Sequence, residues 1–411
     1  MASTFTGQLN ANEITASLFN MIISIRTFAD PIQDGYSSLV DAARVEGGEY
    51  GDTKLYVSTD ALVSRPFGAD ANAGNLLRLH RPPAPKVEKI TISVFRQIAV
   101  TTDQYLSKRA WGSASAFSEF QSVVLAWIDT TKRVYETTLY NVFVGTEISS
   151  QSAAAANIAA QNRTVTLTDR TGMTDATELE AASRLDAMTI GEHMANLMVD
   201  LKDCLRVFND YGLLRAYSPA GLKVVWNAAA FNKIRRVDLP TIFHKDGILE
   251  ELDQTVLPSR YFGTRTSAAV AAASNDGTYR AVYEEDYATA AGADVTHVFP
   301  GDIIPASTSL VTSLNDNGTA AAVDASGIPA GHAYVVDSSV LFKIVSKEDM
   351  PIMSQMAAGT SFFNAASLTT NQYLTWGHNV LAHLSEFPLI TVKVAAAANN
   401  GGGEGGGGAD T

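Results

Sequence analysis

The stretch ASAFSEFQSVVLAWIDTTKRVYETTLYNVFVG, residues 114–145, decides the architecture of this chain of 411 residues. Its apolar residues recur at steps of three, four and seven, so an α-helix would align them on one face. Nothing breaks the helix before Gly145, and at 1.5 Å per residue it would be roughly 45 Å long, more than an ordinary core needs. We therefore predict a spine helix to which other segments attach. Its predicted core residues are Phe117, Phe120, Val124, Trp127 and Leu139.

The first 46 residues are predicted to form an N-terminal arm. Residues 12–27 have the spacing of a short helix, with Asn12 or Thr15 as its cap and Ile14, Leu18 and Ile22 on its apolar stripe. Such a stripe needs a surface to pack on. The sequence leaves open whether that surface belongs to the same chain or to a neighbouring subunit.

Residues 47–100 are predicted to form an extended loop. Two runs alternate apolar and polar residues, with Leu55 and Val57 in the first and Ile90 and Ile92 in the second. About twenty residues rich in Gly, Ala, Asn and Pro separate the runs, which is typical of a long hairpin. A loop of this length is uncommon inside a compact domain, so we infer an extended arm that lies on something outside its own domain.

After the spine, strand and helix patterns alternate, which indicates an α/β region. We expect a helix at 189–211, with Cys204 as a small core residue, then a strand at 221–226 and a helix at 228–236. Residues 263–333 are dominated by Ala, Ser, Thr, Gly and Asp; we expect short strands at 279–283 and 295–299 joined by long loops with few packing obligations. Strand-forming runs return at 333–346, 361–376 and 388–394. The glycine-rich residues 396–411 are predicted to be disordered.

The composition limits the function. A formal charge of -13 argues against tight binding to nucleic acid through phosphates, because that mode needs a basic surface. Cys204 is the single cysteine, which excludes an internal disulfide and a cysteine-built zinc site. No stretch reaches the ~18 apolar residues of a membrane span. We therefore expect no membrane association.

Candidate catalytic and metal-binding residues are few. His378 and His383 would point to opposite faces of a regular strand, so a shared metal is not expected. The acidic triplet 284–286 is interpreted as a solvated turn, with a divalent-cation site as the alternative. The strong enzyme motifs for phosphate binding, nucleophilic serine and zinc hydrolysis do not occur. We expect no enzyme activity, no cofactor and no metal.

A resemblance then connects these segments. The order of arm, long two-stranded loop, spine helix, α/β region and returning strands resembles the major capsid proteins of tailed bacteriophages with the Hong Kong 97 fold. The nearest local likenesses are LKVVWNAAAFNKIRRVDLPTIFHKDGILEELDQTVLPSRYFG at 222–263, the run 334–344, and TWGHNVLAHLSEFPLITVKV at 375–394. The region after Gly263 is longer and more polar than the family usually needs, so the resemblance leaves room for an insertion or a surface subdomain at 263–333.

The resemblance implies an α+β fold: an N-terminal arm (1–46), an extended hairpin loop (47–100), a peripheral domain (101–185 and 334–395, with the spine at 114–145) and an α/β axial domain (186–333). It implies inter-subunit packing by arm and loop residues. These residues are Ile14, Leu18, Ile22, Leu55, Val57, Ile90 and Ile92.

The resemblance also implies a function and partners. The chain would assemble with itself into hexamers and pentamers of an icosahedral shell, in the host cytoplasm, and end in the virion. Further expected partners are a separate scaffolding protein, a portal, a decoration protein and double-stranded DNA held by weak contact. The alternatives are an encapsulin-like cellular container, which the length of 263–333 disfavours, and a hydrolytic or metal enzyme.

Overall fold

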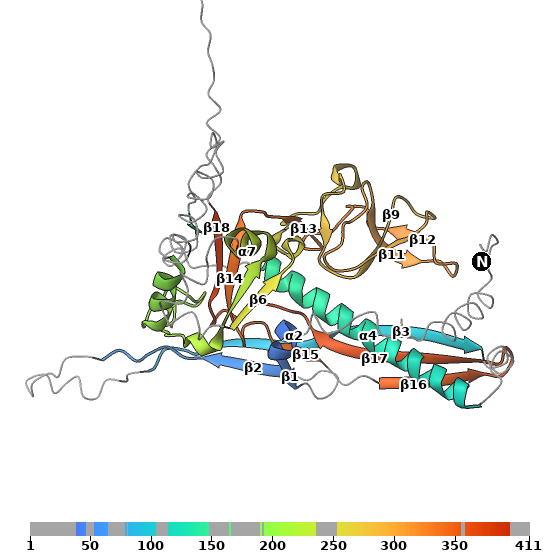
Figure 1. The fold of residues 1–411 in the computed structure, drawn as a ribbon, viewed down its shortest axis with the longest axis horizontal. Helices are drawn as coiled ribbons and strands as arrows, with labels where there is room; N and C mark the ends of the chain where they lie inside the picture. The colour runs from blue at the N-terminus through green and yellow to red at the C-terminus, as the bar shows by residue number, and fades with distance from the viewer. Residues whose placement is uncertain are drawn as a thin grey trace, which may run out of the picture. The chain divides into compact units, whose positions relative to one another are not determined.

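The computed structural model describes residues 38–46, 53–64, 79, 81–103, 114–147, 164–165, 190, 193–235, 253–354 and 358–394 (Figure 1). The chain divides into two compact units. Unit 1 comprises Met1–Glu147, Thr264–Val335 and Lys347–Glu386, and unit 2 comprises Ile148–Gly263, Val336–Ser346 and Phe387–Thr411. Each unit is described by itself below.

The main sheet of unit 1 has the strand order β1-β15-β17-β3-β2, with β16 also paired to β17. Its strands are β1 (Arg44–Glu46), β2 (Thr53–Ser58), β3 (Lys86–Asp103), β15 (Ile352–Ser354), β16 (Ala358–Asn364) and β17 (Thr369–Asn379). β2 and β3 are antiparallel, with Val57 opposite Val87, which confirms the predicted hairpin pairing. The run predicted at 361–376 is two antiparallel strands, because the chain turns back between Asn364 and Thr369.

Helix α4 (Ala114–Thr146) confirms the predicted spine almost residue for residue. It runs along β17 and β3 in Figure 1, and the Tyr135 ring meets Trp376 of β17 edge-on at 6.0 Å between centroids. Leu139 and Val142 are fully buried on the same face. A short helix, α2 (Ser38–Ala43), lies against α4, and Arg44 binds Glu136 of α4 at 2.8 Å. In the described C-terminal part of α4, the periodic apolar residues are therefore buried as the sequence predicts.

Residues 264–335 of unit 1 form a small β structure with a core of its own. One sheet has the order β10-β9-β11-β12, and a second has the order β7-β13-β8. The strands are β7 (Gly263–Arg265), β8 (Arg280–Ala281), β9 (Glu285–Ala288), β10 (Thr296–Val298), β11 (Ser309–Leu314), β12 (Ala320–Val323) and β13 (Ala333–Val336). The core residues are Val270, Ala281, Tyr287, Val298, Ile304, Ile328 and Ala333. The expectation of few packing obligations was wrong, because small and aromatic residues far apart in sequence meet here.

Unit 2 is built on a sheet with the order β4-β18-β14-β5-β6. Its elements are β4 (Thr164–Val165), β5 (Leu222–Asn227), α7 (Ala228–Arg235), β6 (Asp253–Leu257), β14 (Val340–Ser346) and β18 (Leu389–Val394). The predicted strand 221–226 and helix 228–236 are thus confirmed within one residue. The Trp226 ring packs on Phe342 at 4.7 Å and on Phe231 at 5.8 Å, which ties β5, β14 and α7 together.

The helix predicted at 189–211 ends earlier, because its described part spans 193–202. The Asp203 carboxylate accepts a hydrogen bond from the Cys204 amide at 2.8 Å, and Leu205 then pairs with Arg215 through two backbone bonds of 3.0 Å. This turn takes Cys204 out of the helix. The prediction of Cys204 as a core residue was wrong, since the residue is exposed.

The grouping of residues by contacts leaves the expected domain boundaries a prediction. The sequence placed 263–333 in one domain with 186–262, whereas residues 264–335 group with the unit that contains α4. Within the described residues, no helix is both long and apolar enough to cross a membrane.

Candidate functional site

The candidate site has two parts in unit 1: the exposed face of the β2–β3 hairpin and a polar cluster beside the spine. Leu55 and Val57 are 62% and 58% exposed, on the same face of β2, and Val87 opposite Val57 is 54% exposed. Ile90 is half-buried, and Ile92 is buried in its own chain. The hairpin therefore presents an apolar surface that the described residues do not cover.

Other predicted packing residues lie outside the description. Ile14, Leu18 and Ile22 are not among the described residues, and the side chains of Phe117, Phe120, Val124 and Trp127 are likewise outside it, although their helix is described. Leu139 is buried at 2% exposure, in agreement with a core role. Inter-subunit packing by the arm and the loop stays a prediction.

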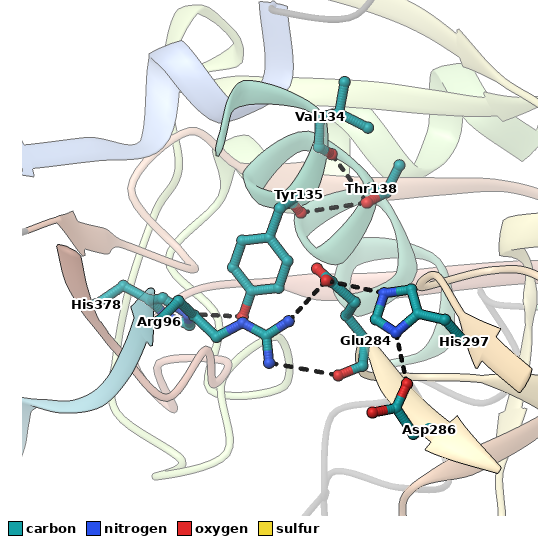
Figure 2. Close-up of polar contacts among 8 residues, drawn as sticks. All are labelled: Arg96, Val134, Tyr135, Thr138, Glu284, Asp286, His297 and His378. Atoms are coloured by element: carbon teal, nitrogen blue, oxygen red, sulfur yellow. Dashed lines mark hydrogen bonds and ion pairs between the residues drawn. The ribbon is translucent and has the colours of Figure 1, made fainter. Parts of the chain in front are cut away.

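The polar cluster is centred on Arg96 of β3 (Figure 2). Its guanidinium lies 2.8 Å from the Glu284 carboxylate, donates to the Glu284 carbonyl at 3.4 Å, and stacks over the Tyr135 ring at 4.8 Å. Arg96 thus joins the long sheet, the spine helix and the 264–335 region. A fork of N–H donors is suited to this, because it can serve several acceptors at once.

Tyr135 and His378 form the buried end of the cluster. The Tyr135 hydroxyl and His378 Nε2 are 2.9 Å apart, and His378 Nδ1 lies 2.8 Å from the Asn379 carbonyl. A carbonyl only accepts, so Nδ1 carries the proton and Nε2 accepts from the tyrosine. Burial lowers the pKa of His378 and raises the pKa of Tyr135 to about 12, so both groups stay neutral at ordinary pH.

The acidic triplet consists of the residue before β9 and the first two residues of β9, and it is not a solvated turn. Glu284 binds Arg96 and lies 3.1 Å from His297 Nε2, while Asp286 lies 2.6 Å from His297 Nδ1. Glu285 Oε1 lies 2.7 Å from His332 Nδ1, and Glu285 Oε2 accepts a hydrogen bond from the Tyr287 hydroxyl at 3.1 Å. Each carboxylate therefore has a named partner within its own unit.

A second polar contact lies at the C-terminal end of α4. The Arg265 guanidinium stacks over Phe143 at 4.0 Å, donates from Nε to Thr146 Oγ1 at 2.9 Å, and lies 3.0 Å from Glu147. Burial lowers the pKa of Arg265. A cation at a helix C-terminus is favourable because the last carbonyls carry partial negative charge. Arg265 thus fixes the start of the 264–335 region to the end of the spine.

The two clustered histidines have separate partners. His378 pairs with Tyr135, whereas His383 binds the buried Asp349 carboxylate through Nδ1. Over the described part of the chain, no group of three His, Cys, Asp or Glu residues is arranged to hold a metal ion. These polar contacts connect segments of the chain that are far apart in sequence.

Sequence reasoning missed Arg96 and Arg265 as attachment residues. Arg96 is separated from Glu284 by 188 positions, a contact that no local pattern reports. One signal was available: Arg96 is the single charge within the apolar run 90–100 and falls on the face of β3 that alternation assigns to the interior.

Comparison with known proteins identifies the fold. No protein-family model matches this chain, and no curated protein sequence matches it. Solved structures do. A chain from the capsid structure of Staphylococcus phage Andhra superposes with a TM-score of 0.52 at 10% identity, covering 89% of this chain and 88% of the other.

A chain from the structure of head fiber and inner core protein gp22 of native bacteriophage P68 gives a TM-score of 0.50 at 8% identity, covering 88% and 86%. These likenesses confirm the predicted α+β capsid fold over most of the chain. At such low identity they establish the fold alone.

Proposed function

We propose that this chain is the major capsid protein of a tailed bacteriophage and assembles into an icosahedral shell of hexamers and pentamers around double-stranded DNA. The observation that carries the proposal is the superposition on a chain of the Andhra capsid structure over 89% of the length. The protein would be located in the virion after assembly in the host cytoplasm.

The hairpin gives the proposal a physical basis. A shell subunit must bury apolar surface against its neighbours, and each Å² of apolar area removed from water contributes roughly 25 cal/mol. Leu55, Val57 and Val87 lie together on one exposed face of the hairpin. In an isolated subunit such a face promotes aggregation, whereas in a shell it can be buried against a neighbouring subunit.

The charge of the chain suits a container for DNA. With a net charge of -13, the protein would repel phosphate overall, so contact with packaged DNA is expected to be weak and local. A separate scaffolding protein, a portal and a decoration protein are proposed as further partners, and they rest on the family resemblance.

Negative-stain electron microscopy with size-exclusion chromatography tests the proposal. The protein is expressed alone and together with the genes beside its own. We expect closed shells or hexameric rings in at least one sample. A monomer in both would refute the proposal and favour an enzyme. Shells filled with protein instead of DNA would favour the cellular container.

A surface variant sharpens the test. Leu55→Asp with Val57→Asp places two charges on the exposed face, so the subunit should fold normally and fail to assemble. The matched control is Lys54→Asp on the opposite face of the same strand, which should assemble at near-normal yield. Normal shells from the double variant would show that this face is not an interface.

A further inference from the structure

Part of the β2–β3 hairpin extends beyond the strands that pair with β17. β3 pairs with β17 from Asp103 back to Ile92, where Asn379 is the last partner. The first six residues of β3, Lys86 to Thr91, pair with β2 instead. We call β2 and residues 86–91 the free hairpin. A two-stranded ribbon is marginal on its own in water, so other contacts must fix its direction.

A turn at 383–386 contacts both strands of the free hairpin. The Ser385 amide donates to the Glu88 carboxylate, at 3.2 and 3.3 Å from its two oxygens. The Ser58 hydroxyl donates to the Glu386 carboxylate. Ser58 is buried at 3% exposure, so this hydrogen bond is shielded from water. One turn thus holds one residue on each strand.

The turn is itself hydrogen-bonded to Asp349. The Leu384 amide donates to Asp349 Oδ1 and to its carbonyl, both at 3.1 Å, and His383 Nδ1 donates to the same Oδ1. The side chains of His383 and Asp349 are 6% and 0% exposed. Two consecutive residues are therefore anchored to a single buried carboxyl group, directly before Ser385 and Glu386.

The Asp349 carboxyl group in this buried pair is only partly compensated by hydrogen bonds. Asp349 Oδ2 is buried without a hydrogen-bond partner among the described residues. Burial is the main cause that raises the pKa of Asp349, opposed by His383 and the Leu384 amide and assisted by the charge of Glu147. The charge of Asp349 also contributes to raising the pKa of Tyr140 of α4, so the two groups interact. Removing one partner of such a pair is costly, because the other is left buried and uncompensated.

We propose that Asp349 and His383 form a lock which, through Ser385 and Glu386, sets the direction of the free hairpin. Without the hydrogen bond between His383 and Asp349, only the Leu384 amide still binds Asp349, so the turn is held less firmly and the free hairpin fluctuates more. The importance of this movement rests on the proposed function, in which the hairpin reaches a neighbouring subunit. The lock itself concerns the single chain.

Hydrogen exchange on the full chain tests the lock. In His383→Leu the ring is replaced by an apolar side chain without a donor, and we expect amides in 53–58 and 86–91 to exchange about tenfold faster. In the matched variant His383→Gln the side chain can still donate to Asp349, and exchange should stay close to wild type. Amides of 94–101 in β3 and 340–346 in β14 serve as internal references and should not change.

Glu88→Ala provides an independent route, since it removes the contact on β3 and leaves the pair intact. It should also accelerate exchange in the free hairpin. Unchanged hairpin exchange in His383→Leu or in Glu88→Ala would overturn the lock, and so would equal acceleration at the reference strands, which would indicate a general loss of stability. Shell assembly is scored separately: a wild-type chain that never assembles defeats the proposed function and leaves the exchange result valid.

Discussion

Replacing Gly327 by Ala should disrupt the 264–335 region. Gly327 has a φ of +94°, and an added Cβ would lie 2.2 Å from the Val270 carbonyl oxygen and 2.8 Å from the Ala272 amide nitrogen. Both obstacles are backbone atoms. They cannot retreat freely, because Val270 and Ile328 exchange two backbone hydrogen bonds of 2.8 Å.

The magnitude follows from two costs. A side chain in the left-handed region costs roughly 1–2 kcal/mol. Relieving the clash requires the Val270–Ile328 bonds to break, at about 1 kcal/mol each. The expected loss is about 3–4 kcal/mol, a large fraction of the ~5–15 kcal/mol by which a domain is stable.

Gly318→Ala is the matched control. Gly318 has a φ of +76°, and an added Cβ would have nothing within 4 Å. It should lose only the conformational part, about 1–2 kcal/mol. The assay is thermal unfolding combined with hydrogen exchange across 264–335. If the two variants lose equal stability, the tight packing inferred at Gly327 is refuted.

Three further predictions concern the spine and its attachments. Leu139→Ala should cost about 2–5 kcal/mol, because the side chain is buried at 2% exposure; a thermal shift under 2 °C would contradict this burial. A double-mutant cycle of Arg96→Met and Glu284→Gln should give a coupling of about 1 kcal/mol in urea unfolding, since the pair is partly exposed; additive losses would show that the ion pair contributes nothing. The hydrogen bond to Glu285 raises the pKa of His332 above 6.5, so the stabilisation from protonated His332 is complete below pH 6.5 and is lost as the pH rises through the folded pKa. Unfolding temperatures measured across this window should fall in wild type and stay flatter in His332→Gln. Parallel curves for the two proteins would exclude the effect.

The spine and most strands of the fold were predictable because their signals are local. A period near 3.6 over 114–145 determines a helix with one buried face, and α4 has these bounds within one residue. The alternation around Leu55 and Ile90 likewise predicted β2 and β3. Strand ends were less certain where a turn inside an apolar run, such as the one after Asn364, divides one predicted strand into two.

The attachments were not predictable because they depend on distant partners. Arg96 and Glu284, or Asp349 and His383, meet only when the tertiary structure forms. The same applies to the core of 264–335, where small residues such as Ala281 and Ala333 are fully buried although their type does not demand it. At Cys204 a local signal was misread, because Asp203 ends the helix through its own side chain.

The meeting of the two ends of 264–335 has a consequence for how the chain can change. The Thr266 amide donates to the Ala333 carbonyl at 2.9 Å, and the Gly331 amide donates to the Thr266 carbonyl at 2.8 Å. The first and last residues of the region are therefore adjacent in space. Segments inserted at such a place alter the rest of a protein little. In the proposed shell, peptides grafted into the exposed turn 315–318 would be presented by every copy of the subunit.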